Sequence, residues 1–218
     1  MKKVAIGFAL TILLLVLIFP TNIPVRAVDF EEESSVDWWA MFRHDLRHTG
    51  YSTSKAPNNN QILWNYRTGS LIGYSSPAVA DGKVYIGSWD KKIYALNSST
   101  GTHIWNYTTG DIVESSPAVA DGKVFIGSWD NKVYALNAST GSLIWNYTTG
   151  SSIGYSSPAV ADGKVYIGSF DNKVYALNAS TGAVIWSYTT GSGVDSSPAV
   201  ADGKVFIGSW DNKVYALN

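Results

Sequence analysis

The clearest candidate for metal chemistry in this sequence is a short cluster of basic and acidic residues near the N-terminal third. It consists of Arg43, His44, Asp45, Arg47 and His48. Two histidines spaced His-x-x-x-His can ligate a metal such as Zn²⁺ through their imidazole nitrogens. A third ligand is not evident beside them, and no helix is assured there. We therefore favour packing and charge pairing for this cluster over a metal site.

A second group of candidates recurs once per repeat, immediately before each Ser-Ser-Pro. Tyrosine and carboxylate alternate at this position, and an aromatic residue stands further along each repeat in Gly-Ser-Trp-Asp or Gly-Ser-Phe-Asp. Such a ring of aromatic side chains suits stacking on sugars, peptides or cofactor rings. The competing hypothesis is that the aromatics pack between repeats and the carboxylates are solvated. The candidate binding face comprises Tyr74, Glu114, Tyr155, Asp195, Trp89, Trp129, Phe170 and Trp210.

These candidates are carried by an internal repeat of 40 or 41 residues. Pro77, Pro117, Pro158 and Pro198 mark its start, and the stretch 115–137 recurs letter for letter at 196–218. The alternation of tyrosine and carboxylate indicates a duplicated two-repeat unit of 81 residues. A period near 40 residues is typical of propellers or solenoids.

Each repeat reads as four short β-rich runs separated by turns. In the second copy the runs are Pro-Ala-Val-Ala, Lys-Val-Phe-Ile-Gly-Ser, Lys-Val-Tyr-Ala-Leu-Asn and Leu-Ile-Trp-Asn-Tyr, with Asp-Gly, Trp-Asp-Asn and Ala-Ser-Thr-Gly between them. Asp-Gly and Asn-containing turns between such runs predict antiparallel hairpins. Four antiparallel strands per repeat predict one blade of a β-propeller. We therefore expect an all-β chain with four blades.

One motif makes the repeat similar to a known family. Residues 95–105, 135–145 and 176–186 each read Ala-x-Asn-x-x-Thr-Gly-x-x-x-Trp. This motif resembles the tryptophan-docking repeat of pyrroloquinoline-quinone-type propellers, a superfamily that includes quinoprotein alcohol dehydrogenases and a non-enzymatic lipoprotein of the outer-membrane assembly machinery. The resemblance extends from about Asp37 to the end and implies that the motif tryptophans dock between blades. The docking residues are Trp64, Trp105, Trp145 and Trp186.

The resemblance does not bring the enzyme activity with it, because fold alone does not determine function. Quinoprotein dehydrogenases generally carry a vicinal cysteine pair, and long insertions that hold a calcium or lanthanide site and a catalytic aspartate. This sequence has no cysteine, and the repeat spacing leaves no room for insertions. We expect a protein that is not an enzyme and has no cofactor and no catalytic or metal site.

The N-terminal third predicts export. Residues 1–27 combine Lys2-Lys3, an apolar run and Val25-Arg26-Ala27, as a secretory signal peptide does. An uncleaved membrane anchor is the alternative. Residues 28–61 are expected to be a linker and entry segment, and residues 62–218 to be the propeller repeats. The blades are expected at about 75–110, 115–150, 156–191 and 196–218, with residues 62–69 as an outer strand.

Five Asn-x-Ser/Thr sequons are candidate glycan acceptors in an exported chain. Good turn chemistry is the competing explanation, because asparagine favours turns in any compartment. The sequons are at Asn97, Asn106, Asn137, Asn146 and Asn178.

The last repeat has only three runs, while Ile62–Gly69 is a fourth run without a blade of its own. Pairing these two pieces would close a four-blade ring and remove the free sheet edges. A fragment of a larger ring, or a half-ring that pairs with another copy, fits the same sequence and is our preferred interpretation, because terminal repeats normally diverge and this one does not.

The function expected from the sequence is a non-catalytic scaffold, secreted or attached to the cell surface, that binds a protein or carbohydrate there. A quinone-dependent dehydrogenase or its remnant, and a structural spacer in a surface layer, are the alternatives. The net charge of −1 gives no indication of a nucleic-acid partner. A membrane contact is expected only through an uncleaved N-terminal segment, and self-association is expected if the ring is incomplete.

Overall fold

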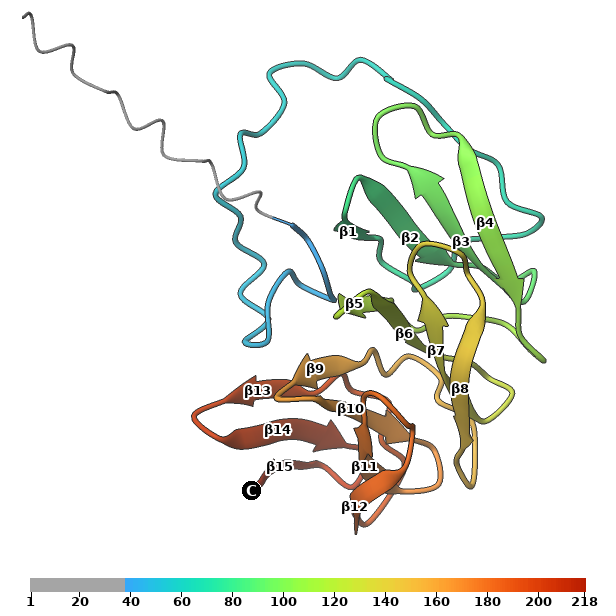
Figure 1. Ribbon diagram of the computed structural model, residues 1–218. Coiled ribbons are helices and arrows are strands. Elements are labelled where there is room, and N and C mark those ends of the chain that lie inside the picture. Colours follow the sequence, from blue (N-terminus) through green and yellow to red (C-terminus); the bar gives the residue numbers. More distant parts are fainter. Residues whose placement is uncertain (1–37) are drawn as a thin grey trace, which may run out of the picture. The chain divides into compact units, whose positions relative to one another are not determined.

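The structure is a computed structural model that describes residues 38–218. The predicted signal peptide and the first part of the linker, up to residue 37, lie outside the described residues. Within residues 38–218 there is no helix, and so no helix that could cross a membrane. The described chain is all-β and forms four successive blades, as the sequence predicted (Figure 1).

The first three blades are four-stranded antiparallel sheets, and the fourth has three strands. Blade 1 contains β1 (Ala78–Ala80), β2 (Lys83–Gly87), β3 (Lys92–Asn97) and β4 (His103–Thr108). Blade 2 contains β5 (Ala118–Ala120), β6 (Lys123–Gly127), β7 (Lys132–Asn137) and β8 (Leu143–Thr148). Blade 3 contains β9 (Ala159–Ala161), β10 (Lys164–Ser169), β11 (Lys173–Asn178) and β12 (Val184–Thr189). Blade 4 contains β13 (Ala199–Ala201), β14 (Lys204–Ser209) and β15 (Lys213–Leu217).

The turns within each blade follow from residues that tolerate positive φ. Asp81 and Gly82, at the first hairpin of blade 1, have φ of 49° and 67°. Both values suit a two-residue hairpin turn of the primed type, and Asp-Gly is a preferred sequence for it. The second hairpin places Asn131 at φ 68°, and asparagine is one of the few residues with a side chain that adopts this conformation readily. Identical turn chemistry therefore produces the same hairpins in every blade.

The core lies between blades. The second strand of each blade ends in Ile-Gly, and a Cβ atom on Gly127 would lie 2.1 Å from Ile153 Cγ2 of the next blade's entry loop. Gly87 and Gly168 meet Val113 and Val194 in the same way. The glycine is required because the neighbouring blade occupies the space of its missing side chain. Ile153, Val113 and Val194 are all fully buried there.

Two serines in each Ser-Ser-Pro link the strands and the blades. The first serine hydroxyl accepts a hydrogen bond from the Ile-Gly amide of its own blade, as Ser115 Oγ does from Gly127 N at 3.1 Å. The second serine connects blades, because Ser76 N donates to Ser116 Oγ at 2.8 Å and Ser116 N donates to Ser157 Oγ at 2.9 Å. This serine chain continues to Ser197 of blade 4.

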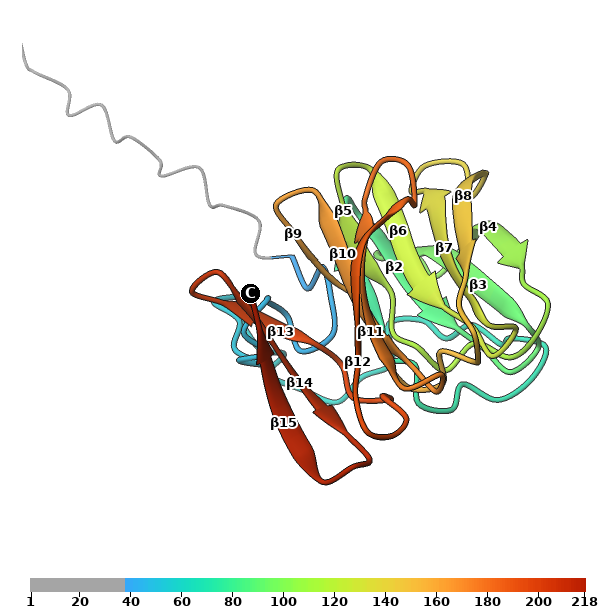
Figure 2. The ribbon, with the colours of Figure 1, turned by 90° about the horizontal axis from the view of Figure 1, so that it is seen from below.

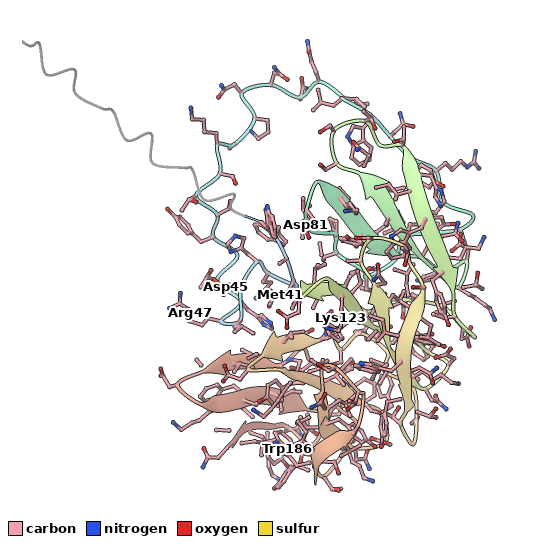
Figure 3. All side chains as sticks on the ribbon, in the orientation of Figure 1. Met41, Asp45, Arg47, Asp81, Lys123 and Trp186 are labelled. Atoms are coloured by element: carbon pink, nitrogen blue, oxygen red, sulfur yellow. The ribbon has the colours of Figure 1, made fainter. Side chains whose placement is uncertain are left out.

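The entry segment, residues 38–52, contacts the innermost strands of three blades through its backbone. The carbonyl oxygens of Trp39, Ala40 and Leu46 accept hydrogen bonds from Val79, Val119 and Val200, on β1, β5 and β13 respectively. Met41 packs into the core shared by blades 2 and 3, and Figure 3 shows it beside the inner strands. The entry segment therefore ties the inner edges of the blades together.

The predicted closure of the ring by pairing of Ile62–Gly69 with β15 is not found. Residues 62–69 form no strand, and the sheet of β15 contains only β13, β14 and β15 among the described residues. Figure 2 shows blade 4 at one end of the row of blades and blade 1 at the other. Residues 62–69 instead lie against blade 1, where Trp64 Nε1 donates to Ser98 O at 2.9 Å. The contacts to the next blade are thus satisfied without the strand pairing.

Burial gives the tyrosines of the blades a clear pH signature. Desolvation and the nearby Asp81 raise the pKa of Tyr85 to about 12, and desolvation with a hydrogen bond to Asp90 raises the pKa of Tyr94 to about 12. A tyrosine in the unfolded chain ionises near pH 10. Because the unfolded state loses its proton first, the stabilisation is complete below about pH 10 and is lost as the pH rises toward 12.

We therefore expect the free energy of unfolding to fall steeply between about pH 10 and pH 12. Urea unfolding followed by circular dichroism across this range measures it, and tyrosinate absorbance should appear together with unfolding. Tyr85→Phe is the matched variant and should make the decline less steep. A free energy of unfolding that stays constant across this interval would contradict the prediction.

Candidate functional site

The candidate functional site is a cavity of about 520 Å³ lined by residues of blades 1, 3 and 4 and of the entry segment. This volume is within the range of small-molecule and peptide pockets. Tyr74 and Tyr155 stand at the cavity with their ring centroids 4.7 Å apart at an interplanar angle of 74°. Tyr74 is 65% exposed and Tyr155 is 37% exposed. The remaining lining residues are Phe42, Ser157, Asp195 and Ser197.

The position of each site tyrosine follows from the turn that precedes Ser-Ser-Pro. In blades 1 and 3 this turn carries an additional glycine, Gly73 or Gly154, before the tyrosine. A Cβ atom on Gly73 would lie 2.3 Å from Trp89 Nε1, and one on Gly154 would lie 2.4 Å from Phe170 Cε2. The glycine therefore lets an aromatic ring of the same blade pack flat against the turn. The tyrosine is left to point away from that ring.

In blades 2 and 4 a carboxylate takes the place of the tyrosine and binds the ring instead. Trp129 Nε1 donates to Glu114 Oε2 at 2.7 Å, and Trp210 Nε1 donates to Asp195 Oδ1 at 3.0 Å. Glu114 is 3% exposed and Asp195 is partly exposed. Of these two carboxylates, only Asp195 lines the cavity. The alternation seen in the sequence is therefore an alternation between two ways of holding the same ring.

The electrostatics of the cavity come from these carboxylates. Desolvation, then Glu114, Tyr74 and Asp195 in that order, raise the pKa of Tyr155. The Tyr155 hydroxyl therefore keeps its proton and is available as a hydrogen-bond donor. The arrangement offers aromatic faces, hydroxyl donors and a carboxylate acceptor within a single cavity.

The recurring aromatics of the predicted binding face form a continuous row of packed rings. Trp129 lies 5.8 Å from Phe170, and Phe170 lies 5.3 Å from Trp210, measured between ring centroids. Trp129 also meets Tyr155 edge-on at 6.1 Å. Trp210 is 61% exposed because no described blade follows blade 4. These rings serve as the floor on which the tyrosines stand, a role that the sequence pattern alone did not reveal.

The docking tryptophans lie between blades. Trp105 Nε1 donates to Ala138 O at 3.1 Å, and its ring covers Gly141 in the turn of blade 2. Trp145 repeats this contact with Ala179 O and Gly182 of blade 3. Trp186 packs against Tyr166 of its own blade and is only partly buried, and Figure 3 shows it at the outer end of blade 3.

The cluster near His44 is organised by packing and local hydrogen bonds. The His44 ring meets Trp39 edge-on at 5.0 Å, and His48 meets Phe42 edge-on at 5.5 Å. Asp45 accepts hydrogen bonds from the backbone amides of Arg47 and Thr49. The described residues contain no group of three or more His, Cys, Asp or Glu that could hold a metal ion.

The sequons fall into two structural classes. Asn97, Asn137 and Asn178 use their side-chain oxygens to accept hydrogen bonds from the two following turn amides, as Asn137 Oδ1 does from Ser139 and Thr140. Asn106 and Asn146 lie exposed on the outer strands β4 and β8. A glycan therefore has more room at these last two positions.

Comparison with known proteins places the repeat. Residues 53–157 and 149–218 match the family model described as outer membrane protein assembly factor BamB. The chain belongs to this family. The recognition of a pyrroloquinoline-quinone-type propeller repeat is confirmed by this match and by the similar solved structures. None of the curated proteins compared with the chain matches it.

Two natural structures show the range of proteins with this fold. BamB from Moraxella catarrhalis is 24% identical with a TM-score of 0.65, over 72% of this chain and 49% of that one. The quinohemoprotein alcohol dehydrogenase from Comamonas testosteroni is 28% identical with a TM-score of 0.61, over 71% of this chain and 27% of that one. The chain thus spans half or less of the length of these natural proteins.

A designed protein, Ika4, is matched over its whole length. It is 21% identical with a TM-score of 0.64, over 73% of this chain and 100% of that one. At this identity the likeness concerns the fold alone.

Proposed function

We propose that this chain is an exported, non-catalytic propeller that binds a segment of a partner protein in the cavity beside Tyr74 and Tyr155. The observation that carries the proposal is the pair of exposed tyrosine rings above a cavity of about 520 Å³ that also contains Asp195. Exposed aromatic side chains clustered at a cavity are typical centres of protein recognition. The family name, an outer membrane protein assembly factor, supports a protein partner and a location outside the cytoplasm.

The chemistry of the cavity selects the kind of segment. The two rings present faces to an apolar or cationic side chain, and a cation above an aromatic face is attracted by the ring quadrupole. Asp195 adds a negative charge at the same place, and Ser157 and Ser197 add small polar groups. We therefore expect a segment with a lysine or arginine flanked by apolar residues. A sugar would use the same rings but would gain little from the charge of Asp195.

The dehydrogenase alternative has a specific argument, because two quinohemoprotein alcohol dehydrogenases share the fold at 26% and 28% identity. The residues described here do not fit that chemistry. Glu114 and Asp195, the carboxylates at the cavity, are each bound to a tryptophan N–H, and no described group gathers three metal-binding side chains. The proposal therefore assigns no cofactor to the chain.

The proposal is tested by capturing partners from solubilised cell-envelope proteins on the immobilised chain and then measuring affinity by calorimetry. Tyr155→Ala and Asp195→Asn should each weaken binding of the captured protein about tenfold or more, as central interface residues do. Ile144→Ala, an exposed apolar residue on β8, is the control and should bind as the wild type does.

Two results would overturn this proposal. One is equal affinity of all three variants for the captured protein, which would place the contact elsewhere. The other is saturable dye-linked alcohol oxidation after addition of the quinone and calcium. Binding on a glycan array that depends on Tyr155, without any protein partner, would reassign the cavity to carbohydrate.

A further inference from the structure

Residues 62–69 are held in the position of an outer strand although they pair with no blade. Gly69 N donates to Asp90 Oδ2 at 2.8 Å, as Gly110 N, at the end of the outer strand β4, donates to Asp130 of blade 2. Trp64 covers Gly101 of blade 1 as Trp105 covers Gly141 of blade 2. One side of this segment is therefore docked like β4 and β8. The backbone groups that β4 and β8 use to pair within their own blades have no strand partner in residues 62–69.

The opposite end of the row of blades lacks the element that residues 62–69 represent. Strand β15 has the same sequence, Lys-Val-Tyr-Ala-Leu, as the first five residues of β7, which pairs with β8. No described residue pairs with the outer edge of β15. Val214 on β15 is 80% exposed, whereas Val133 at the same position of β7 is fully buried.

The side-chain packing at the two ends is complementary as well. Gly127 is filled by Ile153 of the next blade, but a Cβ atom on Gly208 of blade 4 would meet nothing closer than Ser196 at 3.6 Å. Ile72 occupies the position in blade 1 that Ile153 has in blade 3, and it is 47% exposed whereas Ile153 is fully buried. One end therefore has an empty place beside its glycine, and the other has an uncovered isoleucine.

Each end also has a cavity. One of about 350 Å³ lies beside β15 and is lined by Trp186, Tyr188 and Ala216 among others. Another of about 420 Å³ is lined by residues 66–72. Both cavities are formed where an internal blade would have a neighbour.

We propose that residues 62–72 of one copy complete blade 4 of a second copy, so that two copies of this chain close one ring head to tail. In this arrangement Ala216 lies opposite Trp64 and Lys213 opposite Arg67, as Ala135 lies opposite Trp145 and Lys132 opposite Thr148. Ile72 fills the place beside Gly208 and contacts Val214. The Ser197 amide meets the Ser76 hydroxyl and continues the serine chain across the seam.

The occupant is a second copy because the same chain holds its own residues 62–69 against blade 1, away from β15. A head-to-tail contact generates a ring when its rotation closes. Two copies are the expected number, since one chain matches 49% of the length of a propeller that shares its fold. Each chain uses both of its ends, so the ring has no free sheet edge.

One cross-strand pair in the seam is unfavourable. Arg67 stands where the internal outer strands have Thr108, Thr148 and Thr189, all of them opposite lysine. Like charges directly opposite on neighbouring strands are destabilising. This pair distinguishes the proposed register from any other contact between copies.

The register is tested by cross-linking the full chain in a non-ionic detergent. Because the chain has no native cysteine, the double variant Arg67→Cys, Lys213→Cys carries the only thiols. A short bis-maleimide should give a species of twice 23.6 kDa. The control pair Arg67→Cys, Lys132→Cys should remain uncross-linked, because Lys132 is already paired with Thr148. Cross-linking within one chain, or equal yields for both pairs, would overturn the proposal.

The interface is tested by two substitutions with opposite effects on the dissociation constant, measured by mass photometry. Gly208→Ala places a methyl group where Ile72 must pack, so it should weaken association about tenfold or more. Its fold should persist, because the space beside Gly208 is empty in the single chain. Arg67→Thr removes the like-charge pair and should tighten association about two- to fivefold. A monomeric wild type, unchanged association in Gly208→Ala, or no tightening in Arg67→Thr would each contradict the proposal.

Discussion

Trp145→Ala is expected to lower the free energy of unfolding by about 3–5 kcal/mol, the cost of removing a large buried aromatic ring. Trp145 is 8% exposed, donates a hydrogen bond to Ala179 O and covers Gly182. Its removal leaves a cavity between blades 2 and 3 and one carbonyl oxygen without its partner. Urea denaturation followed by far-ultraviolet circular dichroism measures the change.

Trp186→Ala is the matched control, because Trp186 has the same motif around it. Its ring packs on Tyr166 but is only partly buried. We expect a clearly smaller loss than for Trp145→Ala. Equal losses for the two variants would show that the tryptophan stabilises its own blade and not the junction to the next.

The elements of the fold were predictable because their signals are local. Asp81-Gly82 and the equivalent pairs specify hairpins through their own φ preferences, whatever the surrounding blade contains. The four short runs between such turns predicted the four strands of each complete blade correctly. Locality also explains why the recurring Thr-Gly…Trp motif sufficed to recognise the family.

The contacts between blades could not be predicted in the same way. Gly127 and Ile153 are neighbours only because two blades stack, and nothing in Lys-Val-Phe-Ile-Gly-Ser announces which side chain will occupy the space above the glycine. The serine chain through Ser76, Ser116 and Ser157 was likewise missed, although its signal, a Ser-Ser pair before proline in every repeat, is visible in the sequence. Recurrence shows that a residue matters but does not identify its partner.

The closure of the ring failed as a prediction for a related reason. Counting strands showed that Ile62–Gly69 and the last repeat are complementary, and this complementarity is real. Counting does not show whether the two pieces meet within one chain. Docking of Trp64 on Ser98 of blade 1 satisfies that tryptophan without any pairing to β15, so burial of Trp64 gives no further drive to close the ring.

The site was predicted in part. The alternation of Tyr74, Glu114, Tyr155 and Asp195 pointed to one face of the blades, and Tyr74, Tyr155 and Asp195 do share a cavity. Glu114 differs because its carboxylate accepts the Trp129 N–H and is buried. A carboxylate that satisfies a buried donor of the scaffold cannot be distinguished by sequence from one that faces a ligand.

Gly127→Ala is expected to lower the free energy of unfolding by about 1–3 kcal/mol, as overpacking of a filled core does. The added methyl carbon would lie 2.1 Å from Ile153 Cγ2, far inside van der Waals contact, and Ile153 is fully buried. Neither residue can move without separating blade 2 from blade 3. For a chain of this size the melting temperature should fall by about 2–4 °C per kcal/mol, which calorimetry resolves.

The origin of this effect is established by a double-mutant cycle with Ile153→Ala. That second change removes the methyl group in conflict, so the double variant should lose less stability than the two single losses added together. Gly208→Ala, measured at a concentration where the chain is monomeric, introduces the same side chain at the same place in blade 4. It should leave the melting temperature unchanged, because the nearest atom lies 3.6 Å away. A strictly additive cycle, or a Gly208→Ala variant as unstable as Gly127→Ala, would mean that glycine serves the conformation of its own strand and not the contact with the next blade.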